Sequence, residues 1–141
     1  MLNLSDANRA HAAERLRSES VVWLTTVSPD GVPQPTPVWF VWEGGDEITI
    51  YTPPQSLKVR NIRNNDRVAV NFNSDERGAD VVVFLGRATL DDSAPAVKDN
   101  PAYIEKYRRG MQNIGLTPES MSQIYSQPIR VKFSHIRVQG V

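Results

Sequence analysis

Cysteine is absent from this sequence of 141 residues, and histidine occurs only at His11 and His135. The absence of cysteine excludes disulfides, thiolate nucleophiles, cysteine-ligated zinc and iron–sulfur clusters. His11 lies in a stretch of helical composition and His135 in an alternating stretch near the C-terminus, so we expect both at the surface. We therefore expect no metal site, and a hydrolase is the least attractive class because no serine has a histidine that the sequence places nearby.

An excess of charge of one sign is also absent, because 16 Lys and Arg residues balance 16 Asp and Glu residues. A neutral protein has no overall attraction for nucleic acid or for an anionic membrane, so any anion site must be local. No apolar run is long enough to span a membrane, and nothing resembles a signal peptide. We expect a cytoplasmic protein that binds neither nucleic acid nor membranes.

The length fits one domain, spanning residues 1–141, because about 100 to 150 residues is the commonest domain size. An N-terminal helix is predicted at about 5–18, a short helix at 55–64 and a helical insertion at about 95–125. Alternating and β-branched stretches bounded by turn residues predict six strands. These lie at about 21–27, 34–43, 47–52, 66–73, 80–90 and 128–138.

These elements predict a mainly β (α+β) fold, a small antiparallel barrel of six strands with short flanking helices. The turn signals at 28–31 and 44–46 predict that the first three strands form an antiparallel meander. Trp39 and Trp42 fall on opposite faces of the second strand if that strand is regular. Because one aromatic face then needs cover, we expect a homodimer.

The most informative stretch is the end of the third strand, which runs through two prolines into a helix start carrying Ser56, Lys58 and Arg60. Free N–H groups at a helix N-terminus, together with a hydroxyl and a cation, suit a phosphate monoester or diester. The pattern therefore indicates a phosphorylated cofactor. A helix with ordinary solvated charges is the alternative that spacing leaves open.

The sequence resembles the pyridoxamine 5'-phosphate oxidase-like split β-barrel superfamily, from about Val21 to the final strand. Within it, the resemblance is to the branch of oxidoreductases that depend on the deazaflavin coenzyme F420. The residues that carry it are the stretches 24–33, 36–40 and 86–88, and the spaced residues Tyr51, Thr52, Ser56, Lys58, Asn61 and Ile62.

This resemblance implies a split barrel of the FMN-binding type that forms a homodimer with two cofactors at its interface. It implies hydride transfer to or from a small organic substrate, with no catalytic side chain, because the cofactor ring carries the chemistry. The residues implied to line the tricyclic ring are Thr36, Pro37, Val38 and Trp39. Those implied to hold the phosphate are Tyr51, Thr52, Ser56, Leu57 and Lys58, with Arg60 and Asn61 as adjacent candidates.

One departure from the family pattern concerns the cofactor. Flavin-using oxidases of the superfamily often have arginine before the lysine, where this chain has Leu57. The missing charge weakens the case for tight FMN binding, unless Arg60 or Arg77 replaces it. Arg60, Arg63 and Arg67 could meet the polyglutamate tail of F420, or form a plain solvated face.

Two alternatives remain open at this point. One is an FMN-binding flavoprotein or oxidase, and the other is a non-catalytic binder of haem, a tetrapyrrole or the coenzyme itself. Haem ligation normally needs a histidine, and His135 is the candidate in the C-terminal part. The open side of the pocket, which would select the substrate, is expected to come from the loop 74–78, the insertion at 100–121 and the partner subunit.

Overall fold

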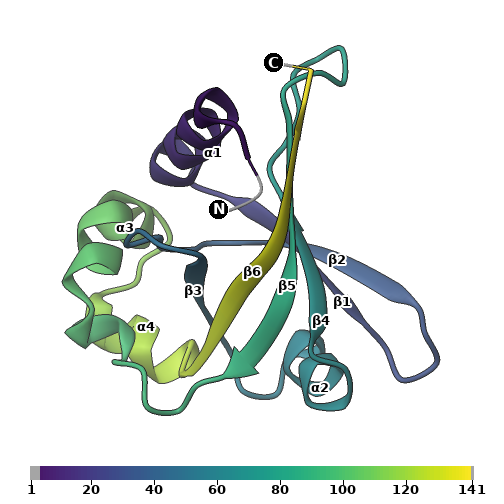
Figure 1. Ribbon diagram of the computed structural model, residues 1–141. Coiled ribbons are helices and arrows are strands. Elements are labelled where there is room, and N and C mark those ends of the chain that lie inside the picture. The colour runs from purple at the N-terminus through teal and green to yellow at the C-terminus, as the bar shows by residue number, and fades with distance from the viewer. Residues whose placement is uncertain (1–3, 141) are drawn as a thin grey trace.

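The computed structural model describes residues 4–140, so residues 1–3 and 141 of the predicted domain lie outside the described residues. Six antiparallel strands form one sheet in the order β2-β1-β4-β5-β6-β3. The sheet curls into a half-barrel with helices along its ends and sides (Figure 1). The predicted fold class, a six-stranded antiparallel split barrel with flanking helices, is confirmed.

The observed elements lie close to the predicted stretches. The strands are β1 Val22–Val27, β2 Pro33–Val38, β3 Glu47–Thr52, β4 Arg67–Asn71, β5 Val81–Leu90 and β6 Gln127–Gln139. The helices are α1 Asp6–Ser18, α2 Leu57–Asn64, α3 Pro101–Asn113 and α4 Pro118–Ile124, with a short 3-10 helix η1 at Val97–Asp99. None of the described helices is long and apolar enough to cross a membrane.

The predicted meander is confirmed for its first pair, because β1 and β2 are antiparallel neighbours, but it is wrong for the third strand. β3 pairs with β6 at the far edge of the sheet rather than with β2, and an isolated bridge joins its Thr49 to Val41, which follows β2. The pairing with β6 buries Ile48 and Ile50 at 1% and 0% exposure, respectively. Long-range burial of these side chains decides the partner, which the turn at 44–46 alone does not.

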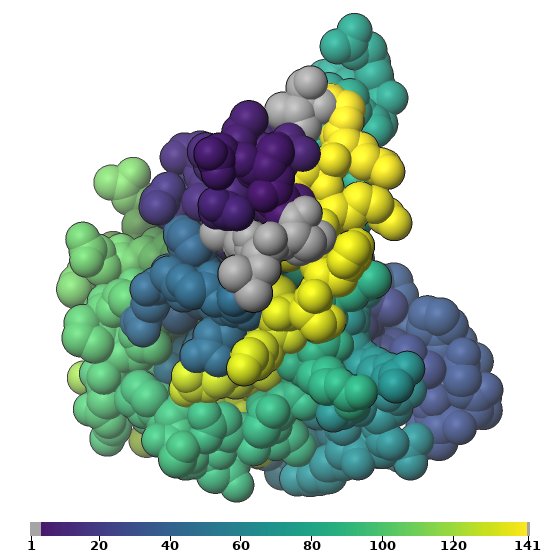
Figure 2. All heavy atoms as spheres, in the orientation of Figure 1, coloured from purple at the N-terminus to yellow at the C-terminus, as the bar shows by residue number. Residues whose placement is uncertain are grey.

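β2 is shorter than the predicted strand 34–43 and forms an edge of the sheet. Pro33, Pro35 and Pro37 alternate along it and lie opposite Val27, Thr25 and Trp23 of β1, respectively. Proline has no N–H group and is tolerated on an edge strand where that group would face outward. The β1–β2 hairpin projects from the body of the molecule at the lower right of Figure 2.

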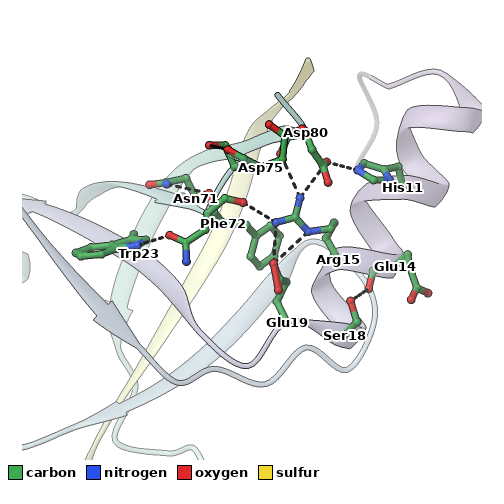
Figure 3. A network of polar contacts seen from close by, with 12 residues as sticks. His11, Glu14, Arg15, Ser18, Glu19, Trp23, Asn71, Phe72, Asp75 and Asp80 are labelled. Carbon is green, nitrogen blue, oxygen red and sulfur yellow. Dashed lines mark hydrogen bonds and ion pairs between the residues drawn. The ribbon is translucent and has the colours of Figure 1, made fainter. Parts of the chain in front are cut away.

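Helix α1 is fixed to the connection between β4 and β5 by a polar network around Arg15 (Figure 3). The Arg15 guanidinium contacts Glu19 at 2.7 Å and Asp80 at 2.9 Å, and donates to the Asn73 carbonyl at 2.8 Å. The hydrogen bond from His11, followed by the charge of Arg15, holds the pKa of the Asp80 carboxyl below its usual value. The network places the loop 74–78 beside α1.

β5 changes register against β6 between Leu85 and Gly86. A Cβ atom added at Gly86 would lie 2.1 Å from the Lys132 carbonyl oxygen, so the two backbones approach more closely than any side chain allows. The glycine in the stretch 86–88 is thus required by strand packing.

We predict that Gly86→Ala lowers the free energy of unfolding by about 1 to 3 kcal/mol, because the clash is with backbone that cannot move freely. Urea denaturation measures the change. Thr89→Ala, at an exposed position of the same strand, is the control and should remain within about 0.5 kcal/mol of the wild type. Equal stability of the Gly86 variant and the wild type would show that strand packing does not require glycine at this position.

Candidate functional site

A cavity of about 530 Å³ lies where the end of β2, the end of β3 and the start of α2 face the α3–α4 pair. Its lining combines a polar group from the β3–α2 connection with an aromatic and apolar group from β2 and the two helices. The lining residues are Val21, Pro37, Val38, Trp39, Tyr51, Thr52, Pro53, Ser56, Lys58, Tyr103, Ile114, Met121 and Tyr125.

The polar corner of the cavity is built around Lys58. Its Nζ atom donates to the Thr52 hydroxyl at 3.0 Å, and that hydroxyl lies 3.1 Å from the Ser56 hydroxyl. Lys58 is half-buried, and burial lowers the pKa of its ammonium group. None of the ion pairs among residues 4–140 includes Lys58. The corner therefore offers a partly desolvated cation that lacks a carboxylate partner.

The first turn of α2 adds backbone donors to the same corner. Ser56 is the N-cap residue in extended conformation, but its side chain makes no capping hydrogen bond to the helix. The N–H groups of the first turn therefore stay unsatisfied by the cap and can serve an anion, whose charge the helix dipole also favours. A hydroxyl, a cation and backbone amides together form a donor set that suits phosphate.

Asn61 serves α2 from its other side and does not line the cavity. Its Nδ2 atom donates to the Thr26 hydroxyl at 2.9 Å and to Gln34 Oε1 at 2.7 Å. Asn61 is 1% exposed. The two bonds tie α2 to the β1–β2 hairpin, which is a positioning role.

The aromatic wall of the cavity belongs to a second hydrophobic cluster that packs outside the main core. Trp39 stacks on Tyr107 with ring centroids 4.5 Å apart and an interplanar angle of 1°. Tyr51 presents its ring to Tyr103 at 4.9 Å, while its hydroxyl donates to the Pro95 carbonyl at 2.8 Å and accepts from Asn100. Tyr51 thus contributes a wall rather than a free hydroxyl.

Helix α3 clamps the chain segment that follows β2. The Tyr107 hydroxyl accepts from the Phe40 N–H at 2.9 Å, and Lys106 Nζ donates to the Phe40 carbonyl at 2.9 Å. The Lys106 ammonium also lies 3.6 Å from the centroid of the Phe40 ring. These contacts fix Trp39, the neighbour of Phe40, against the cavity.

The structure brings most of the predicted cofactor residues together. Those that line the cavity are Pro37, Val38, Trp39, Tyr51, Thr52, Ser56 and Lys58. Thr36, Leu57, Arg60 and Asn61 do not line it. Leu57 is 50% exposed and Arg60, Arg63 and Arg67 are exposed, so the predicted basic strip faces solvent outside the cavity.

The cavity lining and the exposure of His135 bear on other expectations. The predicted insertion does border the cavity, but residues 74–78, Arg77 included, are not among the residues that line it. His135 lies exposed on β6, and among the described residues that line the cavity there is no histidine. Residues 4–140 contain no cluster of three acidic or histidine side chains suited to a metal ion.

Sequence reasoning missed six lining residues. They are Val21, Pro53, Tyr103, Ile114, Met121 and Tyr125. The spacing of Tyr103 and Tyr107, four residues apart on a predicted helix, was the available signal for an aromatic face. It did not reveal which part of the sheet that face would cover.

The fold and the cavity define a split-barrel protein with a pocket that has hydrogen-bond donors at one corner and aromatic side chains along its wall. The family model of pyridoxamine 5'-phosphate oxidase matches residues 9–140. The chain therefore belongs to the pyridoxamine 5'-phosphate oxidase family, which confirms the resemblance noted in the sequence. No curated protein matches the chain significantly.

Solved structures share this fold at low sequence identity. A conserved hypothetical protein from Mycobacterium tuberculosis is 23% identical, with a TM-score of 0.74 over 97% of this chain and 85% of its own. An F420 reductase is 22% identical, with a TM-score of 0.67 over 88% and 94%. The haem storage protein HutZ from Vibrio cholerae is 17% identical, with a TM-score of 0.66 over 94% and 95%. Such identities establish the fold and leave function to the site.

We predict that Lys106 makes stability rise with pH. Burial lowers the pKa of its ammonium group from 10.5 to about 8. Between these values the unfolded chain holds a proton that the folded protein has lost, so the free energy of unfolding increases with pH. Lys106→Met should flatten this rise in urea denaturation at pH 7.5 to 9.5, whereas Lys98→Met, at an exposed position, should retain it. If the free energy of unfolding rises equally with pH in the Lys106 variant and the wild type, the prediction is refuted.

Proposed function

We propose that this protein is an oxidoreductase that binds a phosphate-bearing flavin-type cofactor at the Lys58 corner, with coenzyme F420 as the first candidate and FMN as the alternative. The observation that carries the proposal is the half-buried Lys58 ammonium group, which faces the cavity without a carboxylate partner. Burying a cation is costly unless an anion compensates it. A phosphate group would supply that compensation.

The charge of the corner favours F420 over FMN. F420 carries its phosphate as a diester with one negative charge, whereas the FMN monoester carries a charge of about −1.5 to −2 at neutral pH. Lys58 is the cation among the residues that line the cavity, and Leu57 stands where flavin-using relatives have arginine. A single cation matches a diester more closely than a dianion. The structural likeness to an F420 reductase is consistent with this choice.

The residues present fit the remaining parts of such a cofactor. Lys58, Ser56 and the first amides of α2 would hold the phosphate, and the β2 end with Trp39 would flank the ring system. When bound, the cofactor supplies hydride transfer through its own ring. The chain then has to bind and orient the cofactor and the substrate, and it has to exclude water from them. The clamp by Lys106 and Tyr107 holds the ring-flanking segment in place for that task.

A homodimer forms part of the proposal. Val21 and Ile114 line the cavity yet are 38% and 56% exposed, and Leu57 beside the phosphate corner is 50% exposed. Apolar side chains at the rim of a cavity are covered when a second subunit packs there. A partner at this rim would also close the open side of the cavity and complete the substrate site.

We predict that Lys58→Ala weakens binding of F420 by about 1.5 to 3 kcal/mol, the usual contribution of a charged hydrogen bond. A fluorescence titration of purified protein with F420, and in parallel with FMN and haem, measures the affinities. Lys58→Arg keeps the cation and should retain most of the affinity, while Arg60→Ala, which lies outside the cavity, should not change it. Unchanged affinity in Lys58→Ala would remove the lysine from the site.

We also predict that the protein has twice the mass of one chain in sedimentation velocity at micromolar concentration. Ile114→Glu should shift it towards the monomer, because a buried unpaired charge opposes association. Ile124→Glu is the matched control, since Ile124 is 48% exposed on α4 but does not line the cavity. A monomeric wild-type protein that binds F420 would exclude the interface from the proposal.

A further inference from the structure

Three tyrosines of the aromatic cluster differ in how their hydroxyl groups are satisfied. The Tyr51 hydroxyl donates to the Pro95 carbonyl at 2.8 Å, and the Tyr107 hydroxyl lies 2.8 Å from the carbonyls of both Ser20 and Phe40, either of which accepts its single proton. The Tyr103 hydroxyl is buried and has no hydrogen-bond partner in the described part of the chain. Tyr103 is 0% exposed, so bulk solvent does not reach its side chain.

An unpaired buried hydroxyl is unfavourable for folding, because it loses water and gains nothing in return. The ring of Tyr103 already packs well, 4.9 Å from Tyr51 and 4.8 Å from Tyr107 between ring centroids. A phenylalanine would keep this packing and avoid the loss. A polar group in such a position calls for a partner that binds at another stage of the functional cycle.

Tyr103 belongs to the wall of the cavity that also contains Lys58. The two side chains come from different elements, Tyr103 from α3 and Lys58 from the start of α2. Met121 of α4 packs in the same hydrophobic cluster as Tyr103, and it lines the cavity together with the apolar Ile114. A hydrogen-bond donor on this apolar side would recognise an acceptor on the organic part of a ligand whose phosphate is held by Lys58.

We propose that the Tyr103 hydroxyl donates a hydrogen bond to a carbonyl oxygen or ring nitrogen of the heterocycle of the cofactor. This inference rests on the proposed function and extends it by naming the residue that would hydrogen-bond to the polar edge of the ring. It adds a contact from the helical insertion to those that the strands and α2 provide. Tyr103 is a specificity-determining residue in this assignment, not a proton donor in the reaction.

The hydroxyl remains a donor throughout the physiological pH range. Burial raises the pKa of Tyr103 far above its usual value, so the phenol keeps its proton. Because the side chain is fully buried, an acceptor reaches the hydroxyl only after a neighbouring side chain moves. Met121 shares both the cluster and the cavity wall, and its unbranched thioether side chain changes rotamer easily.

The test compares Tyr103→Phe with Tyr107→Phe in two measurements, the thermal midpoint without added ligand and the dissociation constant for F420 and FMN. For Tyr103→Phe we expect an unchanged or higher midpoint and an approximately tenfold weaker affinity for whichever cofactor the wild type binds. For Tyr107→Phe, which loses hydrogen bonds present in the folded chain, we expect a lower midpoint.

The outcomes distinguish failure of the Tyr103 assignment from failure of the proposed cofactor-binding function. If the wild type binds and Tyr103→Phe binds equally well, the tyrosine assignment is overturned and the proposed function stands. If Tyr103→Phe lowers the midpoint as Tyr107→Phe does, the hydroxyl has a structural partner and the assignment is again overturned. If the wild type binds neither F420 nor FMN, the proposed function fails and the inference fails with it.

Discussion

The architecture depends on β6 pairing with two strands at once. β6 pairs with β5 along most of its length and with β3 along its first half, from Gln127 to Lys132. This double pairing curls the sheet and carries β3 to the edge opposite β2 (Figure 1). The end of β3 then leads directly into α2, so the hydroxyl of Thr52 meets the ammonium group of Lys58. The polar corner around Lys58 is thus a consequence of how the sheet closes.

The cavity is built from groups whose polar requirements the described chain leaves partly unmet. Lys58 is desolvated without a counter-charge, and the Tyr103 hydroxyl is buried without a partner. Such groups lower the stability of the folded state, and proteins keep them chiefly where a ligand satisfies them. Both groups line one cavity although they come from different elements, which is why we propose a common ligand for them.

Other polar contacts hold the elements around the cavity together. Arg15 joins α1 to the β4–β5 connection through charged contacts, and the Asn61 amide nitrogen joins α2 to the β1–β2 hairpin through two hydrogen bonds. Lys106 and Tyr107 join α3 to the Phe40 backbone in the segment after β2. These contacts hold the elements around the cavity in fixed positions. A rigid frame of this kind suits hydride transfer, which needs two carbon atoms held in close and constant geometry.

The sequence by itself determined the elements and the polar corner around Lys58. Alternation and turn residues mark the six strands, and Thr52, Ser56 and Lys58 lie within seven positions of one another, so local geometry brings them together. Tertiary structure alone decided that β3 pairs with β6 and that Tyr103, about fifty positions further along, joins the same cavity. The reason is that strand partners and cavity walls follow from which distant apolar surfaces bury each other, and neither periodicity nor spacing within one segment contains that information.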